Sequence, residues 1–292
     1  MPELPEVEAL ARFLGDRASG REVAGARLLS VAALKTFDPP AEALVGRMVG
    51  EVSRRGKFLV VGMEGDPPLS LVVHLARAGW LRWHDEVKPA APGPTRPRKG
   101  PLAFQLVLAD GAGIDLTEAG TEKRLALYVV RSPDEVEGIG RLGPDPLDPA
   151  VDADVLAARL REHGGQLKGA LTDQTVLAGV GNAYSDEVLH VARLSPFKAA
   201  DKLSDEEAAR LHRALREVLE DAVQRSADLP AAGLKAEKRA GMRVHGRKGQ
   251  PCPECGDVVR EVSFATKFLN YCPTCQTGGK PLADRRLSRL LK

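Results

Sequence analysis

Four cysteines in one short segment constrain the fold of this chain more than any other feature. They form two Cys-x-x-Cys pairs, Cys252/Cys255 and Cys272/Cys275, separated by sixteen residues. Two pairs at such a spacing are typical of a tetrahedral structural zinc site in which each pair forms a knuckle. We therefore expect one zinc ion and a zinc finger too small to fold without it. Because four thiolates leave no open position for water, this zinc is expected to be structural and not catalytic.

The first eight residues, Met-Pro-Glu-Leu-Pro-Glu-Val-Glu, predict a reactive amine beside two carboxylates. Removal of Met1 would leave Pro2 with a secondary amine, which condenses with a sugar aldehyde to a cationic iminium. Glu3 and Glu6 follow at the start of an expected helix, and Pro5 suits its first turn. Apolar residues recur there at helical spacing: Leu4, Val7, Leu10, Ala11 and Leu14. The alternative interpretation is an ordinary helix cap rich in proline and glutamate.

Charge is distributed unevenly along the chain, although the net charge is only +2. Residues from Gly233 onward include 13 Lys/Arg and 5 Asp/Glu, so the preceding residues hold 29 and 35. A basic C-terminal part on a mildly acidic body favours a polyanionic partner, with a solvated basic tail as the alternative. No apolar run is long enough for a membrane span and no signal segment opens the chain. We therefore expect a cytoplasmic protein with no membrane partner.

Short β-rich runs separated by turn signals occupy the first part and predict a β-sandwich behind the leading helix. Arg54-Arg55-Gly56-Lys57 is expected at a hairpin tip, and 88–101 as an exposed loop. The expected strands are Val49–Ser53, Phe58–Met63, Leu69–Leu75, Trp80–Trp83, Phe104–Leu108 and Leu125–Val130.

Helical periodicity begins after the linker Gly-Pro-Asp-Pro-Leu-Asp-Pro at 143–149. The expected helices are Val151–His163, Gly169–Leu177, Ala183–Leu194 and Ser204–Gln224. A capping box of Ser204 and Glu207 is expected to start the last one. The second and third flank Ala-Gly-Val-Gly-Asn, which indicates a tight double turn between helices. These strand, linker and helix patterns thus predict an α+β chain of several domains, at residues 1–140, 141–232 and 233–292.

Taken together, these motifs resemble the formamidopyrimidine-DNA glycosylase and endonuclease VIII family of bifunctional base-excision repair enzymes. The resemblance covers nearly the whole chain. It rests on the N-terminal octapeptide, Arg-Arg-Gly-Lys at 54–57, Leu-Thr-Asp-Gln with Ala-Gly-Val-Gly-Asn-Ala-Tyr in 171–184, and His-Gly-Arg-Lys-Gly-Gln-Pro-Cys at 245–252. It implies a catalytic β-sandwich domain, a helix–two-turns–helix domain and a zinc finger with a basic tail, with damaged double-stranded DNA in the cleft between domains.

The resemblance also implies a role for individual residues. Pro2 would attack the deoxyribose C1′ and release the damaged base, and strand nicking by β/δ-elimination would follow. Glu3 and Glu6 would be the acidic residues beside it, and Lys57 would contact phosphate next to the lesion. A flipped nucleotide is required, because the base cannot be attacked inside the duplex. The implied DNA-binding residues are Lys57, Arg77, Lys123, Arg124, Lys168, Asn182, Tyr184, Arg247 and Lys267.

This chain departs from the family pattern in the segments that contact the damaged nucleotide in the family. At 74–79 the usual His-Leu-Gly-Met-Ser-Gly is His-Leu-Ala-Arg-Ala-Gly, so Arg77 replaces a wedge methionine. Lys267 stands where a finger arginine is usual, which keeps the charge but loses the bidentate fork. Thr117–Leu125 replaces the usual Asp-Pro-Arg-Arg-Phe loop and puts Leu125 at an aromatic wedge position.

Retention of the nucleophile with altered lesion-reading segments predicts a divergent paralogue. We expect an active glycosylase and lyase, acting as a monomer and associated with the nucleoid when bound to DNA. Ala227–Arg243, which joins the last helix to the His-Gly-Arg-Lys motif, looks too short to cap a flipped oxoguanine. One alternative is a catalytically weak or silent paralogue that binds damaged DNA. Another, a zinc-ribbon interaction module, explains the cysteines but neither Pro2 nor the sandwich.

Overall fold

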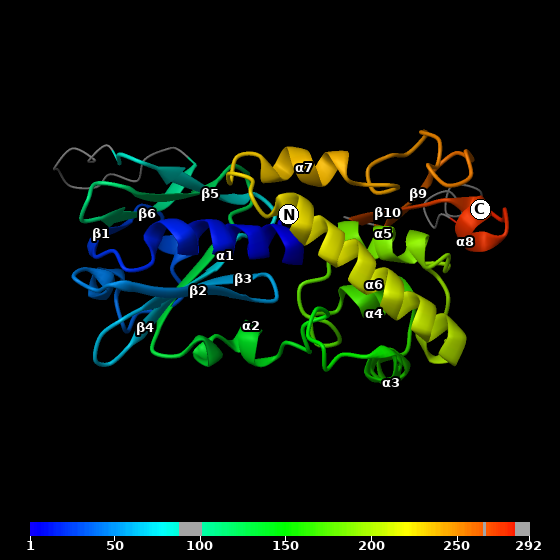
Figure 1. Cartoon of the computed structure of the whole chain (residues 1–292), viewed down its shortest axis with the longest axis horizontal. Helices are drawn as coiled ribbons and strands as arrows, with labels where there is room; N and C mark the ends of the chain where they lie inside the picture. The colour runs from blue at the N-terminus through cyan, green and yellow to red at the C-terminus, as the bar shows by residue number, and fades with distance from the viewer. Residues whose placement is uncertain (88–100, 265–266, 284–292) are drawn as a thin grey trace. The chain divides into compact units, whose positions relative to one another are not determined.

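The computed structural model describes residues 1–87, 101–264 and 267–283, which form two compact units (Figure 1). The first unit is Met1–Arg141 with Arg225–Leu234, and the second is Leu142–Gln224 with the chain from Lys235 onward. The division into three domains at residues 140 and 232 stays a prediction. The loop expected at 88–101 falls, except for Pro101, outside the described residues.

The leading helix α1 (Leu4–Ala18) forms where the apolar spacing predicts it. Its five spaced apolar residues are all buried: Leu4, Val7, Leu10, Ala11 and Leu14. The carboxylate of Glu6 accepts the backbone N–H of Glu3 at 2.7 Å, which satisfies a donor that the helix start leaves unpaired. On the outer side of α1, Glu8 accepts a hydrogen bond at 2.8 Å from Nε of Arg54, which belongs to strand β2 (Val49–Arg55).

Two four-stranded antiparallel sheets form the predicted sandwich. One has the order β1-β6-β7-β5: Val23–Leu28, Leu102–Leu108, Gly113–Glu118 and Gly79–His84. The other has the order β2-β3-β4-β8: Val49–Arg55, Phe58–Met63, Leu69–His74 and Ala126–Val130. Between β1 and β2 lie the short helices η1 (Val31–Ala33) and η2 (Ala41–Leu44), and η3 (Pro133–Glu135) and α2 (Glu137–Gly140) follow β8. Apolar residues of α1 and of both sheets form one core.

The sequence analysis missed strands β1 and β7, because tertiary pairing and not local propensity makes them strands. β1 reads Val-Ala-Gly-Ala-Arg-Leu, and its pairing with β6 is irregular between Val23 and Gly25. β7 opens at Gly113, where a Cβ would lie 2.1 Å from the carbonyl oxygen of Leu106. Only glycine fits so close to a neighbouring strand, and glycine is a weak strand signal in a sequence.

The second unit is mostly helical. Its helices are α3 (Ala153–His163), α4 (Leu167–Thr172), α5 (Asn182–Val191), η4 (Ala200–Lys202), α6 (Asp205–Ser226, which ends in the first unit), α7 (Leu234–Ala240) and α8 (Pro273–Thr277). The predicted capping box is present, since Ser204 N–H donates to Glu207 and Glu207 N–H donates to the Ser204 hydroxyl. The expected helix Gly169–Leu177 is wrong in extent, because Asp173 turns the chain by accepting the N–H and the hydroxyl of Thr175.

Between the two cysteine pairs the chain forms an antiparallel hairpin of β9 (Arg260–Phe264) and β10 (Lys267–Tyr271). The hairpin, the sandwich and the helices together confirm the predicted α+β class with a C-terminal four-cysteine finger. None of the described helices is long and apolar enough to cross a membrane.

Candidate functional site

Two buried carboxylates lie at the start of α1, next to Pro2. Glu3 and Glu6 are each only 2% exposed, and Pro2 is buried, whereas Met1 is exposed. The amino end of a helix carries a partial positive charge that favours such carboxylates. The structure thus places Pro2 and two acids at one helix start, where the Glu6 carboxylate accepts the Glu3 N–H.

Lys57 follows the tip of the β2–β3 hairpin, where Gly56 adopts a left-handed φ of 56°. The Lys57 side chain is only 8% exposed. His74 lies opposite Phe58 in the next strand, with ring centroids 4.8 Å apart. Burial, and then the charge of Lys57, lower the pKa of His74 to about 4, so this imidazole is neutral at pH 7. His74 therefore adds no positive charge beside Lys57 at pH 7.

Arg77 stands in a tight turn between β4 and β5. Ala76 has a φ of 48°, and the N–H of Gly79 donates to the carbonyl of Leu75 at 2.9 Å. A Cβ at Gly79 would lie 2.2 Å from that carbonyl oxygen, so the turn requires glycine there. An open pocket of about 220 Å³ adjoins the turn; its lining is Arg77, Ala78, Glu118, Gly120, Thr121, Glu122 and Arg124. Two segments that depart from the family pattern therefore share one pocket.

Buried Glu118 organises the loop that carries Lys123 and Arg124. Its carboxylate accepts the backbone N–H of Arg124 at 2.6 Å and of Leu125 at 2.8 Å. The Lys123 ammonium donates to the Glu118 carbonyl at 2.8 Å. Leu125, expected at an aromatic wedge position, is only 1% exposed and belongs to the sandwich core. An aliphatic side chain gains more from the core than from the surface, and so it does not project as a wedge here.

Lys168 and Asn182 meet in the second unit. The Lys168 ammonium donates to the Asn182 carbonyl, the Ser185 hydroxyl and the Asp186 carboxylate at 3.0, 2.8 and 2.6 Å. An ammonium has three N–H donors, so all are engaged within the protein. The Asn182 side chain donates to the carbonyl of Phe268 in β10 at 2.8 Å. A contact between Lys168 and DNA stays a prediction. In the structure, the hydrogen bonds of Lys168 orient the start of α5.

The remaining predicted binding residues lie nearby in the same unit. Tyr184 is buried in α5, with the ammonium of Lys238 4.6 Å from the centre of its ring. The Arg247 guanidinium donates to the Met242 carbonyl and to the Gln250 side chain, and so it holds its own loop. Lys267 is the first residue of β10, next to the strand position whose carbonyl Asn182 contacts.

Two acidic residues of α5 that the sequence analysis did not single out bind the finger. Asp186 accepts His245 Nδ1 at 2.7 Å and the backbone N–H of Asn270 at 3.1 Å. Glu187 accepts the backbone N–H groups of 243–245 at 2.6, 3.0 and 2.8 Å. Burial raises the pKa of Glu187. An Asp-Glu pair on a helix usually indicates solvent exposure, so the sequence carried no signal for this contact.

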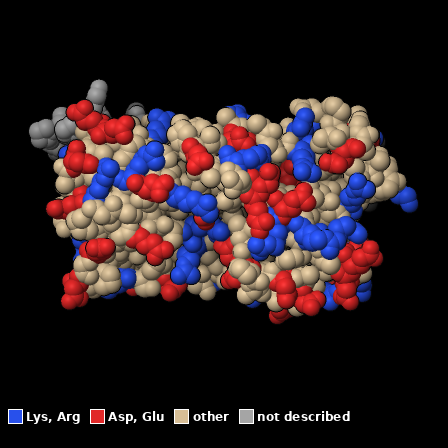
Figure 2. Space-filling model, viewed as in Figure 1, with Lys and Arg blue, Asp and Glu red and all other residues tan. Residues whose placement is uncertain are grey.

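One face of the molecule shows Lys and Arg interspersed with Asp and Glu (Figure 2). The basic excess that the sequence places after Gly233 therefore does not form a uniformly basic surface on the coloured part of this face.

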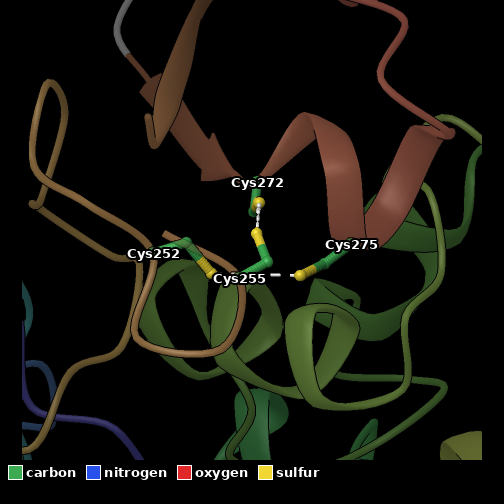
Figure 3. Close-up of side chains that lie close together, drawn as sticks. All are labelled: Cys252, Cys255, Cys272 and Cys275. Atoms are coloured by element: carbon green, nitrogen blue, oxygen red, sulfur yellow. Dashed lines mark hydrogen bonds between the residues drawn. The ribbon is translucent and has the colours of Figure 1, made fainter. Parts of the chain in front are cut away.

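The four cysteine side chains converge on one point (Figure 3). Their sulfur atoms all lie within 4.8 Å of one another, with Cys255–Cys272 at 3.4 Å and Cys252–Cys275 at 3.9 Å. Zinc–sulfur bonds of about 2.3 Å in a tetrahedron require sulfur separations of about 3.8 Å. Burial raises the pKa of Cys272 to about 11, so bare thiolates would be unfavourable without a cation among them. The residues fit one zinc ion, as predicted.

We expect protein purified without chelator to contain about one zinc per chain. Cys272→Ser should lose the metal and the order of the β9–β10 hairpin, because three thiolates cannot close the tetrahedron. Glu254→Gln, between Cys252 and Cys255 but not a ligand, is the matched control and should retain zinc. Metal analysis with circular dichroism is the measurement. Zinc-free parent protein, or full zinc in Cys272→Ser, would contradict this assignment.

Comparison with known proteins agrees with this architecture along the chain. Residues 1–119 match the formamidopyrimidine-DNA glycosylase N-terminal domain, 142–230 its H2TH domain, and 249–278 the zinc finger found in FPG and IleRS. The formamidopyrimidine-DNA glycosylase of Thermus thermophilus is 37% identical over 289 residues, covering 96% of this chain and 100% of that one.

Two further similar proteins illustrate the match in sequence and in structure. An uncharacterized formamidopyrimidine-DNA glycosylase-like protein of Mycobacterium tuberculosis is 62% identical over 151 residues, 52% of this chain and 94% of that protein. A Lactococcus lactis FPG mutant solved with a Fapy-dG containing DNA superposes with a TM-score of 0.81 at 28% identity, covering 94% of this chain and 100% of that one. Sequence motifs, fold and zinc centre agree with these matches, and the chain belongs to the formamidopyrimidine-DNA glycosylase family.

Proposed function

We propose that this protein is a base-excision repair DNA glycosylase with AP lyase activity that uses Pro2 as its nucleophile. The observation that carries the proposal is the position of Pro2 beside two buried carboxylates, Glu3 and Glu6, at the start of α1. Removal of Met1 would expose the secondary amine on which the chemistry depends. Relatives named formamidopyrimidine-DNA glycosylases, 32–37% identical over most of this chain, support the same reaction class.

The reaction balances with these groups alone. The Pro2 nitrogen attacks C1′, the bond from C1′ to the base breaks, and the base leaves with a proton. Opening of the sugar ring breaks the C1′–O4′ bond, and O4′ takes up a proton for which Glu3 is the proposed donor. The resulting iminium is an electron sink, so loss of a C2′ proton expels the 3′ phosphate. A second elimination expels the 5′ phosphate, and water then releases the sugar remnant from Pro2.

The proposed partner is damaged double-stranded DNA. We propose that the protein binds it as a monomer, in the nucleoid. Lys57 supports this because it follows a tight hairpin turn at Gly56, and a lysine suits one phosphate as a point charge. Asn182 begins α5, and a helix start after a glycine-rich turn suits another phosphate. Lys267, Arg247, Lys123 and Arg124 are proposed as further backbone contacts, and Lys168 and Tyr184 as residues that support Asn182.

The pocket beside Arg77 supports a substrate preference. Arg77, Arg124 and Glu122 line it, and Leu125 contributes no wedge, because it lies in the core. An arginine stacks on exposed bases but fills a gap in the duplex less completely than a methionine. We therefore expect poor selection on the fine shape of a purine, and preference for lesions and distorted sites where flipping costs least.

The altered wedge also favours a second candidate, a damaged-DNA-binding paralogue with weak or no catalysis. Leu125 in the core is the specific observation for it. The two candidates differ in one respect, which is whether Pro2 forms a covalent adduct.

Blocking the Pro2 amine, for example by one extra residue before it, should abolish borohydride trapping of abasic-site DNA. Only a nucleophilic amine forms the reducible iminium. DNA binding should remain close to that of the parent, which separates loss of chemistry from misfolding. Undiminished trapping by the blocked protein would remove Pro2 as the nucleophile.

Lys57→Gln should weaken DNA binding for every sequence and make the dependence of log K on log salt shallower by about one unit. Lys202→Gln is the matched control, since Lys202 is exposed in η4 and next to Asp201. Affinity is measured across a salt series with the melting temperature checked for both variants. A slope unchanged from the parent would place Lys57 outside the DNA interface.

Single-turnover cleavage of matched duplexes should be slow for oxoguanine opposite cytosine. Abasic sites, oxidised pyrimidines, ring-opened purines or bulkier adducts should be cut faster, and unpaired substrates faster still. The physical reason is that Arg77 fills the gap left by a flipped base less completely than methionine, so substrates that flip at least cost should react fastest. If oxoguanine opposite cytosine is the fastest substrate, the assignment of this pocket is wrong.

A further inference from the structure

A buried histidine lies against one of the zinc ligands. His190, near the end of α5, is only 1% exposed, and its Nε2 lies 3.2 Å from Sγ of Cys252. That distance falls within hydrogen-bonding range for a nitrogen and a sulfur. Cys252 is itself buried, so water does not compete for this contact.

The other ring nitrogen identifies which tautomer the site holds. Nδ1 of His190 is buried and has no hydrogen-bond partner within the described part of the chain. A neutral imidazole carries one N–H, on either nitrogen. A proton on Nδ1 would bury an unpaired donor and would turn the lone pair of Nε2 toward a thiolate. A proton on Nε2 avoids both penalties and points the N–H at the sulfur.

We propose that His190 is an outer-sphere residue of the zinc centre, whose Nε2–H donates a hydrogen bond to the zinc-bound thiolate of Cys252. Such a donor withdraws charge from the sulfur and fixes the orientation of the ligand, as partners of metal ligands generally do. The sequence gives no hint of it, because His190 and Cys252 are sixty-two positions apart. The inference rests on the zinc centre and is independent of the proposed catalysis.

The contact between His190 and Cys252 adds to a series of hydrogen bonds that join α5 to the finger. Asn182 at the start of α5 donates to the Phe268 carbonyl, and Asp186 and Glu187 in its middle accept backbone N–H groups of the finger segment. His190 adds the metal centre itself at the far end of the helix. Occupancy of the zinc site is thereby coupled to the helix whose first residue is Asn182.

The test compares zinc release from the full-length, zinc-loaded protein to an excess of a chromophoric chelator. His190→Phe keeps a buried ring but removes the donor, and it should release zinc about 10-fold faster. His190→Gln keeps an N–H and should stay close to the parent. His212→Phe is the control, since His212 is also partly buried in this unit but bonds to the carbonyl of Val151.

A second measurement separates a hydrogen bond from simple packing. With cobalt in place of zinc, the thiolate-to-metal charge-transfer band should move to lower energy in His190→Phe and not in His190→Gln or His212→Phe. If folded His190→Phe matches the parent in release rate and band, the proposal is overturned. Should that variant not fold, nitrogen NMR of the parent decides: a proton on Nε2 supports the bond, and a proton on Nδ1 excludes it.

Discussion

The packing of α1 on the sandwich is the interaction on which the candidate chemistry depends. Its apolar face is buried with residues of both sheets in one core, and this fixes where the helix begins. Glu3 and Glu6 are buried because the helix start is buried, and Pro2 is held beside them for the same reason. Two carboxylates at such a site are tolerated because the helix end offers N–H groups and a favourable dipole. The burial of Pro2, Glu3 and Glu6 therefore follows from the packing of α1.

In the second unit, buried hydrogen bonds hold the finger segment against α5. Asp186 and Glu187 are buried in α5 and accept N–H groups from the finger, and each such bond replaces a lost contact with water. Zinc then closes a finger whose own apolar core is small, with Val244, Val259 and the cysteines. The two contributions are complementary, since hydrogen bonds fix the finger on α5 and the metal fixes it internally.

Features set by local rules could be predicted from the sequence. The spacing of Leu4, Leu10 and Leu14 predicted α1. The Ser204–Glu207 pair predicted the start of α6, and the spacing of the cysteines predicted the zinc centre. Features that depend on residues far away in the sequence could not be predicted from it. Gly113 lies in a strand because it pairs with Val107 and His84, and Leu125 is held at the core by a hydrogen bond from its N–H to Glu118 as well as by apolar burial. The roles of the individual residues that we propose to contact DNA stay predictions for the same reason, because the proposed partner lies outside the chain.

The central claim is that Pro2 carries out the chemistry, and the site of covalent attachment tests it most directly. DNA with an abasic site is reduced onto the protein with borohydride, the complex is digested, and the modified peptide is sequenced by mass spectrometry. If Pro2 is the nucleophile, the sugar remnant should be on the amine of Pro2, in a peptide that lacks Met1. Attachment to a lysine, such as Lys57, or a peptide that retains Met1 and is modified elsewhere, would contradict it.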